Sequence, residues 1–216
     1  EAWLPGEEGG TAVAETLFGL NNPGGKLPLS YPRSVGQLPM YYNHKKSGQF
    51  SNPYRNYVDQ PTSPLYPFGH GLSYTEFAYR DFSISQAEAV SGDVVEVAVM
   101  VHNIGPVAGD EVVQLYSKDE FASCPRPVKE LRGYRRIHLA PGESKQVVFQ
   151  LPVDQLAFIN NALELVLEAG SIKLMVGSSS EEIHHTALLQ ITETRPLAFK
   201  DRVFDCPVVV KPCVVC

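Results

Sequence analysis

Adjacent carboxylates near the start of the sequence are the first residues whose types could support chemistry. Glu7 and Glu8 stand in the stretch Gly-Glu-Glu-Gly-Gly. Enzymes that work with two carboxyl groups hold them about 5 to 10 Å apart on opposite sides of the reacting bond, which neighbouring residues cannot easily do. Negative charge just before a helix also has a structural explanation, since it is favourable by ~0.3 to 1 kcal/mol. We therefore interpret the pair as charges that flank a helix.

Histidines and cysteines provide two further candidates. His184 and His185 follow two glutamates and resemble a metal cluster, but neighbouring side chains on a strand point to opposite faces and cannot share one ion. We expect a solvated strand entrance there. The step Cys213-Val-Val-Cys216 could be half of a zinc site or a redox pair. No histidine follows it, so the sequence favours a frayed or non-native terminus.

The loop Asn43-His44-Lys45-Lys46 is the most interesting polar segment. Loops carry a large share of binding residues, and histidine titrates near neutral pH, so this loop is a candidate ligand contact, with an ordinary polar turn as the alternative. The sequence contains no nucleophile elbow, phosphate loop, dinucleotide fingerprint or His-Glu-x-x-His motif. It predicts no metal and no cofactor.

Length and composition narrow the functional classes. The chain has 216 residues, of which 44% are hydrophobic and 19% charged, typical of a soluble globular protein. Its net charge of -6 argues against nucleic acid or an anionic membrane as partner and favours a neutral substrate or a protein surface. No stretch approaches the ~20 apolar residues that span a bilayer. The sequence starts at Glu1 without an initiator Met or signal segment, so we expect it to be truncated there.

The first part of the chain resembles the end of a larger α/β unit. Thr11 can cap a short helix with Val13, Leu17 and Phe18 on one face and Gly19 at its end.

A turn at 22–25 then leads into an extended piece at 26–30, where Pro28 suits an edge strand. Residues 38–75 are rich in proline and tyrosine, so we expect a connection without regular structure that packs on a neighbouring surface.

Alternation with period two dominates from about residue 80. Val95, Val97, Val99 and Val101 alternate with more polar residues, as in a half-buried strand. Further strands are predicted at 112–117, 130–139, 145–151, 171–176 and 185–191, with glycine turns at 140–143 and 169–171. This pattern predicts an antiparallel β-sandwich of immunoglobulin-like size.

Several ordered segments resemble the C-terminal third of glycoside hydrolase family 3, the class of bacterial β-glucosidases. These segments are Ala2-Trp3-Leu4-Pro5-Gly6-Glu7-Glu8-Gly9-Gly10, NPGGKLPLSYPRSVGQLPMYYNH (22–44), PLYPFGHGLSYTEF (64–77), GDEVVQLY (109–116), RPVKELRGYRR (126–136), LAPGES (139–144) and MVGSSS (175–180). The similarity spans residues 1 to about 192 and is much more specific than any single short motif.

The resemblance implies a division into parts. Residues 1–37 would end an α/β sandwich domain, 38–75 would form a Pro/Tyr-rich connection, and 76–193 a fibronectin type III-like β-sandwich. Residues 194–216 do not resemble the family and form a tail of uncertain origin. We thus expect a mainly β chain whose sandwich follows the remnant of an α/β domain. In the family, a (β/α)8 barrel carries the nucleophilic aspartate and the α/β sandwich that follows it carries the acid/base glutamate, so both residues would precede Glu1.

The implied reaction is retaining hydrolysis of a β-glucoside or related oligosaccharide, through a glycosyl-enzyme intermediate. This chain would support the catalytic domains and be inactive alone. The family also implies a periplasmic or secreted location. The sequence leaves open whether the protein forms a homodimer. We expect a loop to border the outer substrate cleft through Tyr41, Asn43, His44, Tyr54 and Tyr57.

A stand-alone carbohydrate-binding or protein-interaction module is the alternative. A sandwich could hold a glycan by stacking sugar rings on exposed aromatic side chains. The predicted sandwich contains no tryptophan, because Trp3 lies outside it, which weakens this alternative.

Overall fold

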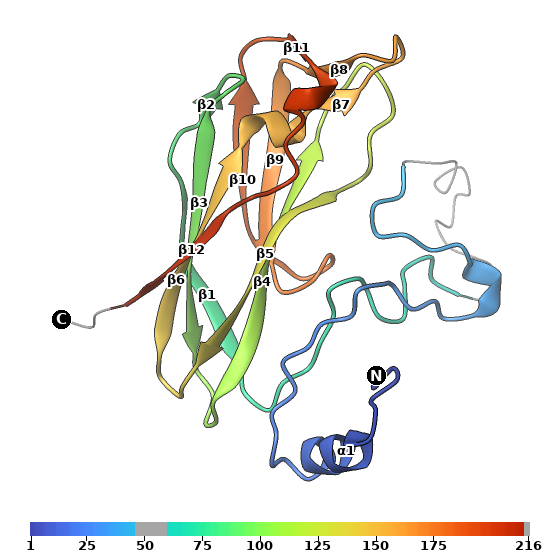
Figure 1. Ribbon diagram of the computed structural model, residues 1–216, viewed down its shortest axis with the longest axis vertical. Helices are drawn as coiled ribbons and strands as arrows, with labels where there is room; N and C mark the ends of the chain where they lie inside the picture. The colour runs from blue at the N-terminus through green and yellow to red at the C-terminus, as the bar shows by residue number, and fades with distance from the viewer. Residues whose placement is uncertain (46–59, 214–216) are drawn as a thin grey trace.

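The computed structural model describes residues 1–45 and 60–213. Most of them form a two-sheet β-sandwich, with the N-terminal segment running along one side of it (Figure 1). The strands are β1 (Phe77–Ile84), β2 (Glu88–Ala89), β3 (Val94–Asn103), β4 (Gly109–Asp119), β5 (Glu130–Leu139), β6 (Ser144–Pro152), β7 (Phe158–Ile159), β8 (Leu165–Leu167), β9 (Gly170–Gly177), β10 (Ile183–Ile191), β11 (Arg195–Leu197) and β12 (Val208–Pro212).

The two main sheets have the orders β1-β3-β6-β12 and β2-β10-β9-β4-β5, and a small third sheet has the order β11-β8-β7. Neighbouring strands are antiparallel, apart from the short parallel pair of β2 and β10. Every strand predicted from alternation lies within an observed strand. The predicted β-sandwich is therefore confirmed.

The hydrophobic core lies between the two main sheets. The four alternating valines of β3 are fully buried, and Val97 pairs with the equally buried Phe149 of β6. The second sheet contributes Val113, Leu115, Leu174, Val176 and Leu189 from the other side. Each such side chain stabilises the fold by roughly 1.5 to 3 kcal/mol on burial.

Glycine behaves as predicted at one turn and differently at the other. Gly142 has φ 76°, and the Glu143 N–H donates to the Ala140 carbonyl at 3.0 Å, as the turn at 140–143 requires. Gly170, in contrast, lies outside the left-handed region and begins β9. The predicted glycine turn at 169–171 is therefore wrong.

Irregular pairing brings the two adjacent histidines to the same neighbouring strand. The register of β10 shifts between Ile183 and His185, but burial still alternates along the strand, with His184 exposed and His185 half-buried. The His184 ring stacks on Tyr79 of β1, with ring centroids 4.1 Å apart, and the His185 ring stacks on Phe82 at 5.3 Å. That the two imidazoles point to opposite faces stays a prediction. Among residues 1–45 and 60–213, no cluster of three or more potential metal ligands occurs.

The C-terminal tail is part of the sandwich and is not frayed up to residue 213. β12 pairs antiparallel with β6, with Val208 opposite Phe149. Val208 and Val210 pack against the core, as does Cys206 in front of the strand. The prediction of a frayed terminus is wrong because these apolar side chains complete the core. Cys213 is exposed, and Cys216 of the predicted cysteine pair lies outside the described residues.

Helix α1 (Gly9–Leu17) lies away from the sandwich (Figure 1). It begins two residues before the predicted cap Thr11, with Glu8 as N-cap and without a side-chain capping hydrogen bond. Gly19 follows its end with φ 77°, as predicted. Gly9 is its buried residue. Within the described part of the chain, no helix is long and apolar enough to cross a membrane.

The segment after α1 pairs with a later one but forms no strand. The Leu27 N–H donates to His70 O at 2.8 Å, and the Gly69 N–H donates to Leu27 O at 2.7 Å. The predicted edge strand at 26–30 is therefore wrong, because the pairing covers too few residues. A short 3-10 helix spans Val35–Gln37. The described parts of 38–75 contain only isolated bridges, in agreement with the prediction of an irregular connection.

Candidate functional site

Three of the five predicted substrate-contact residues share one exposed turn. Tyr41 is 65% exposed, and Asn43 and His44 are exposed beside it. The His44 Nδ1 atom lies 3.1 Å from the Lys45 carbonyl oxygen, so the imidazole is oriented by its own loop. Tyr54 and Tyr57 lie outside the described residues. The structure therefore brings together Tyr41, Asn43 and His44.

A neighbouring residue that the sequence did not single out, Tyr42, anchors this turn. Its ring stacks on Phe68 with centroids 4.2 Å apart and meets the Tyr116 ring edge-on at 6.0 Å. Its hydroxyl accepts a hydrogen bond from the Leu131 N–H at 3.2 Å. The His44 carbonyl also accepts one from the Val128 N–H at 2.9 Å. These contacts hold the turn against the sandwich and leave its polar side chains facing outward.

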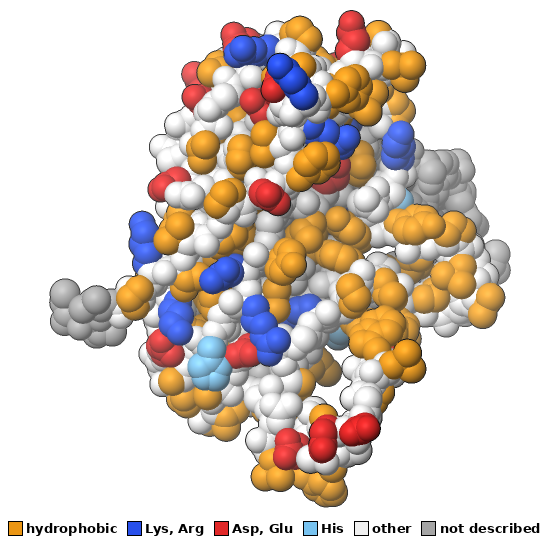
Figure 2. All heavy atoms as spheres, viewed as in Figure 1, with side chains coloured by type: hydrophobic (Ala, Val, Ile, Leu, Met, Phe, Trp, Pro, Cys, Tyr) orange, Lys and Arg blue, Asp and Glu red, His pale blue; other side chains and the backbone are white. Residues whose placement is uncertain are grey.

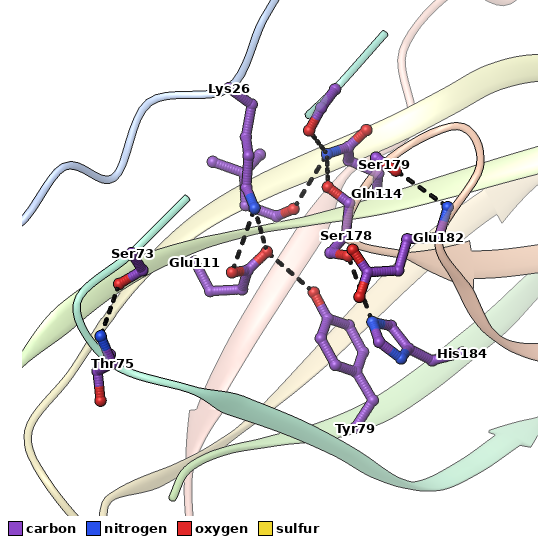
Figure 3. A network of polar contacts seen from close by, with 12 residues as sticks. Lys26, Ser73, Thr75, Tyr79, Glu111, Gln114, Ser178, Ser179, Glu182 and His184 are labelled. Carbon is purple, nitrogen blue, oxygen red and sulfur yellow. Dashed lines mark hydrogen bonds and ion pairs between the residues drawn. The ribbon is translucent and has the colours of Figure 1, made fainter. Parts of the chain in front are cut away.

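A buried polar network joins the N-terminal segment to the sandwich (Figure 3). The Lys26 Nζ atom lies 3.1 Å from Glu111 Oε1 and 3.4 Å from Oε2. The Tyr79 hydroxyl donates to Glu111 Oε1 at 3.1 Å. Lys26 comes from the segment after α1, Tyr79 from β1 and Glu111 from β4. A single carboxyl group thus ties together three separate parts of the chain.

Burial controls the protonation of this group. Removal from water raises the pKa of Glu111, although the Lys26 ammonium and the Tyr79 hydrogen bond act in the opposite direction. Burial and, next, the charge of Glu111 raise the pKa of Tyr79 well above its ordinary range, so the phenol keeps its proton and donates it. Burial also lowers the pKa of His184, which stacks on Tyr79.

Gln114, three residues after Glu111 on β4, forms a second contact between the sandwich and the segment around Gly69. Its Nε2 donates to Gly69 O at 3.2 Å and to Ser178 O at 2.6 Å, while Tyr116 donates to its Oε1. Gly69 has φ 79°, and a Cβ atom there would come within 2.2 Å of Gln114 Oε1. Only glycine allows this approach. The Ser180 N–H adds a hydrogen bond to Phe68 O at 2.9 Å.

Asparagine side chains form a third group of contacts between the sandwich and the residues that precede it. Asn22 donates from Nδ2 to Ala108 O at 2.9 Å, and its Oδ1 accepts from the Ser73 hydroxyl at 3.0 Å. Asn103, fully buried at the end of β3, accepts from the Thr75 hydroxyl at 2.6 Å. Asn22 and the end of the 38–75 connection, at Ser73 and Thr75, are therefore fixed to the sandwich by directional hydrogen bonds.

These arrangements suit positioning better than reaction. Glu111, Lys26 and Tyr79 satisfy one another through an ion pair and a hydrogen bond. Little in the sequence indicates the network, because Lys26 and Glu111 are 85 positions apart. The only local signal is a glutamate within the otherwise largely apolar segment GDEVVQLY.

A polar hollow of about 320 Å³ lies elsewhere, where β5 meets the C-terminal segment. Arg126, Arg132, Gln155 and Phe204 are among the residues that line it. The aromatic rings there are not free platforms, since a guanidinium lies 4.2 Å from the centroid of Phe158 and another lies 4.9 Å from that of Phe204. This hollow offers hydrogen bonds but little ring surface for stacking a sugar.

The N-terminal segment exposes many large apolar side chains. Leu4, Phe18, Leu20 and Val35 are between 81% and 98% exposed, and α1 buries little against the sandwich. In Figure 2, orange hydrophobic side chains gather on the surface of the N-terminal segment, beside the sandwich. An apolar surface of this kind is typical of an interface with another folded part. We call residues 1–38 with these exposed side chains the apolar face.

Comparison with known protein families agrees with this architecture. Residues 1–74 match the glycosyl hydrolase family 3 C-terminal domain, and residues 111–180 match the fibronectin type III-like domain. The periplasmic β-glucosidase of Salmonella typhimurium is 42% identical over 189 residues, covering 85% of this chain and 25% of that protein. A β-xylosidase of Formosa agariphila is 44% identical over 183 residues, covering 84% and 25%.

Comparison with solved structures indicates the same family. The crystal structure of a β-glucosidase from Listeria innocua in complex with glucose superposes with a TM-score of 0.83 at 40% identity, covering 89% of this chain and 27% of that one. The chain therefore spans about a quarter of the length of the relatives it matches. With one segment that matches the family's C-terminal domain and a second that matches its fibronectin type III-like domain, the chain belongs to glycoside hydrolase family 3.

Proposed function

We propose that this chain is the supporting C-terminal part of a β-glucosidase-type glycoside hydrolase. The observation that carries the proposal is the apolar face of residues 1–38, which polar contacts fix to the sandwich. Such a face needs a partner surface, and the rest of a family 3 enzyme would provide one. The sandwich would then hold the other domains in a fixed relative position, on which the separation of two catalytic carboxyl groups depends.

The division of parts follows the same proposal. Residues 1–37 would complete an α/β sandwich domain, 38–75 would connect it, and 76–193 would form the supporting sandwich. The strands β11 and β12 would extend that sandwich beyond residue 193. The nucleophilic aspartate and the acid/base glutamate of retaining hydrolysis would come from the remaining three quarters of the enzyme. Alone, the 216-residue chain would not hydrolyse aryl β-glucosides.

Two forms of the protein test this division. The 216-residue chain and the longest protein encoded in the same reading frame are assayed side by side with aryl β-glucosides and aryl β-xylosides. We expect turnover only from a longer protein that contains the catalytic domains. Dose-dependent release of the aryl group by the purified chain alone would contradict the proposal.

The exposed turn is proposed to border the outer, leaving-group part of the substrate cleft. Tyr41, Asn43 and His44 supply one aromatic ring and two hydrogen-bonding groups on its surface, and Tyr54 and Tyr57 belong to the same proposed loop. In the complete enzyme, His44→Ala should lower kcat/KM more for long glucosides than for short ones, because only long substrates reach this region.

His138→Ala is the matched control, since His138 is an exposed histidine on β5 far along the sandwich surface. Equal kcat/KM values for His44→Ala and wild type on both short and long glucosides would exclude the turn from the cleft.

A neutral β-glucoside or related oligosaccharide is the substrate class that this proposal implies. A periplasmic or secreted location accompanies it, in keeping with the periplasmic β-glucosidase among the relatives. A homodimer is a separate proposal that light scattering of the complete enzyme would test. The competing function, a glycan-binding module, predicts retardation of the chain in affinity electrophoresis on soluble glucans. Migration without retardation is expected at the polar hollow beside β5, because guanidinium groups lie over the rings of Phe158 and Phe204 there.

A further inference from the structure

Glu111 is a carboxyl group buried at the contact between the N-terminal segment and the sandwich. Its side chain is 5% exposed, and that of its partner Lys26 is 14% exposed. The two residues belong to parts of the chain that otherwise meet through neutral hydrogen bonds such as those of Asn22 and Gln114. This pair is therefore the charged component of the contact.

The titratable groups around this pair come from four places. Lys26 approaches from the segment after α1, and Tyr79 from β1. His184 of β10 stacks on Tyr79, and its Nε2 lies 3.4 Å from the Ser178 hydroxyl. Glu182, in the turn before β10, acts on both Tyr79 and His184 through its charge. Lys26 is the cation in direct contact with the Glu111 carboxyl group.

We propose that Glu111 and Lys26 form an acid-sensitive clamp. The clamp holds the segment around Lys26 on β4 while the carboxyl group is ionised, and it releases that segment when the carboxyl group is protonated. The proposal rests on the contacts within the described residues and holds whether or not the chain supports a glycosidase.

The coupling follows from the charges that meet at the clamp. The Lys26 ammonium lowers the pKa of Glu111 against the larger effect of burial. While Glu111 stays buried in the sandwich, removing Lys26 would thus let Glu111 take up a proton more easily, and by linkage a proton on the buried Glu111 weakens the docking of Lys26. Burial keeps His184 neutral to lower pH than usual by lowering its pKa. Once protonated, His184 adds a positive charge on the same side and further disfavours Lys26.

Acid acts differently on the clamp and on the whole fold. Since burial raises the pKa of Glu111 above its ordinary value of 4.5, its contribution to overall stability is fully present at low pH and is lost as the pH rises through the raised pKa. Protonation of Glu111 therefore does not by itself unfold the sandwich. Opening of the clamp and unfolding of the core should respond to pH in opposite directions through this group.

Hydrogen exchange of the 216-residue chain tests the clamp without any activity assay. The Leu27 amide, next to Lys26, reports the docked segment through its hydrogen bond to His70 O. The Val97 amide in β3 reports the core. After correction for intrinsic exchange, protection of Leu27 should fall as the pH is lowered from neutral, by at most ~10-fold per pH unit for one proton, while Val97 stays protected.

Variants separate the carboxyl group from other causes. Glu111→Gln keeps the shape and the acceptor for Tyr79 but has no charge, so Leu27 should be weakly protected at every pH and lose its pH dependence. Lys26→Met should give the same weak protection at neutral pH. Glu143→Gln is the matched control, because Glu143 forms an exposed ion pair with Lys145 at 3.1 Å. It should behave as wild type.

Two results would overturn the proposal. One is a Leu27 protection factor that does not change with pH in the wild-type chain. The other is a pH dependence that persists unchanged in Glu111→Gln, which would assign it to His184 or to another group. If Glu111→Gln fails to fold, the wild-type titration and Lys26→Met still decide the question.

Discussion

The sandwich and the N-terminal segment are built on different physical principles. Between the sheets, Val97, Leu115, Phe149 and Leu174 are fully buried, and alternation along each strand makes this burial inevitable. In α1, by contrast, Gly9 is the buried residue, and Phe18 at its C-cap is 83% exposed. Non-directional burial of apolar area holds the sandwich together, whereas directional polar contacts place the N-terminal segment.

This difference indicates what each region is for. Hydrophobic burial supplies most of the stability of a fold but little information about where a neighbouring part must sit. Buried hydrogen bonds add little net stability, about 0.5 to 1.5 kcal/mol each, but they are strict about geometry. The contacts of Asn22, Lys26 and Gln114 with the sandwich therefore fix a position and an orientation. These contacts thereby hold the apolar face in a fixed orientation relative to the sandwich.

Truncating one aromatic ring in each region should give the largest difference in stability between the sandwich and the N-terminal segment. Phe149→Ala removes a fully buried ring and should lower the free energy of unfolding by ~3 to 5 kcal/mol. Phe18→Ala, matched in chemistry, should change it by less than ~0.5 kcal/mol, since the ring faces solvent. Urea unfolding followed by circular dichroism measures both. Comparable losses for the two variants would show that α1 is already covered in the isolated chain.

Removing the last strand should have the next largest effect. A chain that ends at residue 205 loses Val208 and Val210 from the core, together with the pairing of β12 with β6. We expect a loss of roughly 2 to 4 kcal/mol in the free energy of unfolding, because two partly buried valines and an exposed core edge are involved. The same urea experiment applies. A truncated chain as stable as the full one would show that residues 206–213 do not contribute to the stability of the core.

The anchor of the exposed turn should show the smallest effect, and a local one. Tyr42→Phe keeps the ring stack on Phe68 but loses the acceptor for the Leu131 N–H, which corresponds to about 0.5 to 1.5 kcal/mol. Hydrogen exchange should show faster exchange at Leu131 and an unchanged rate in β3. Tyr41→Phe, at an exposed neighbour, is the control. Equal rates at Leu131 in both variants would mean that the turn is held by its backbone alone.

Much of the sandwich could be predicted from the sequence, because its signal is local. Alternation places Val95 to Val101 of β3 correctly, and the Pro-Gly turn at 140–143 results from its residue types. The bulges in β1 and β10 could not be predicted this way. A single extra residue shifts the register of a strand against its partner, and the residue types of β1 and β10 do not show where this shift occurs.

The polar contacts were beyond prediction for a different reason. Lys26 and Glu111 are 85 positions apart, and only the folded chain brings them together. Tyr41 and Tyr42 are identical in type, and nothing in the sequence tells which of them anchors the turn and which is exposed. β12 was missed because a short apolar stretch at the end of a sequence has the same composition whether it frays or pairs.

The last strand also governs how copies of this chain behave toward one another. Without β12, β6 would be the outer strand of its sheet, and its unpaired N–H and C=O groups could add a strand from a second molecule. β12 occupies those groups and itself carries Lys211 and Pro212, a charge and a residue without an N–H. Both discourage further strand addition. At this edge of the sandwich, the chain thus discourages intermolecular β-pairing and the aggregation that such pairing causes.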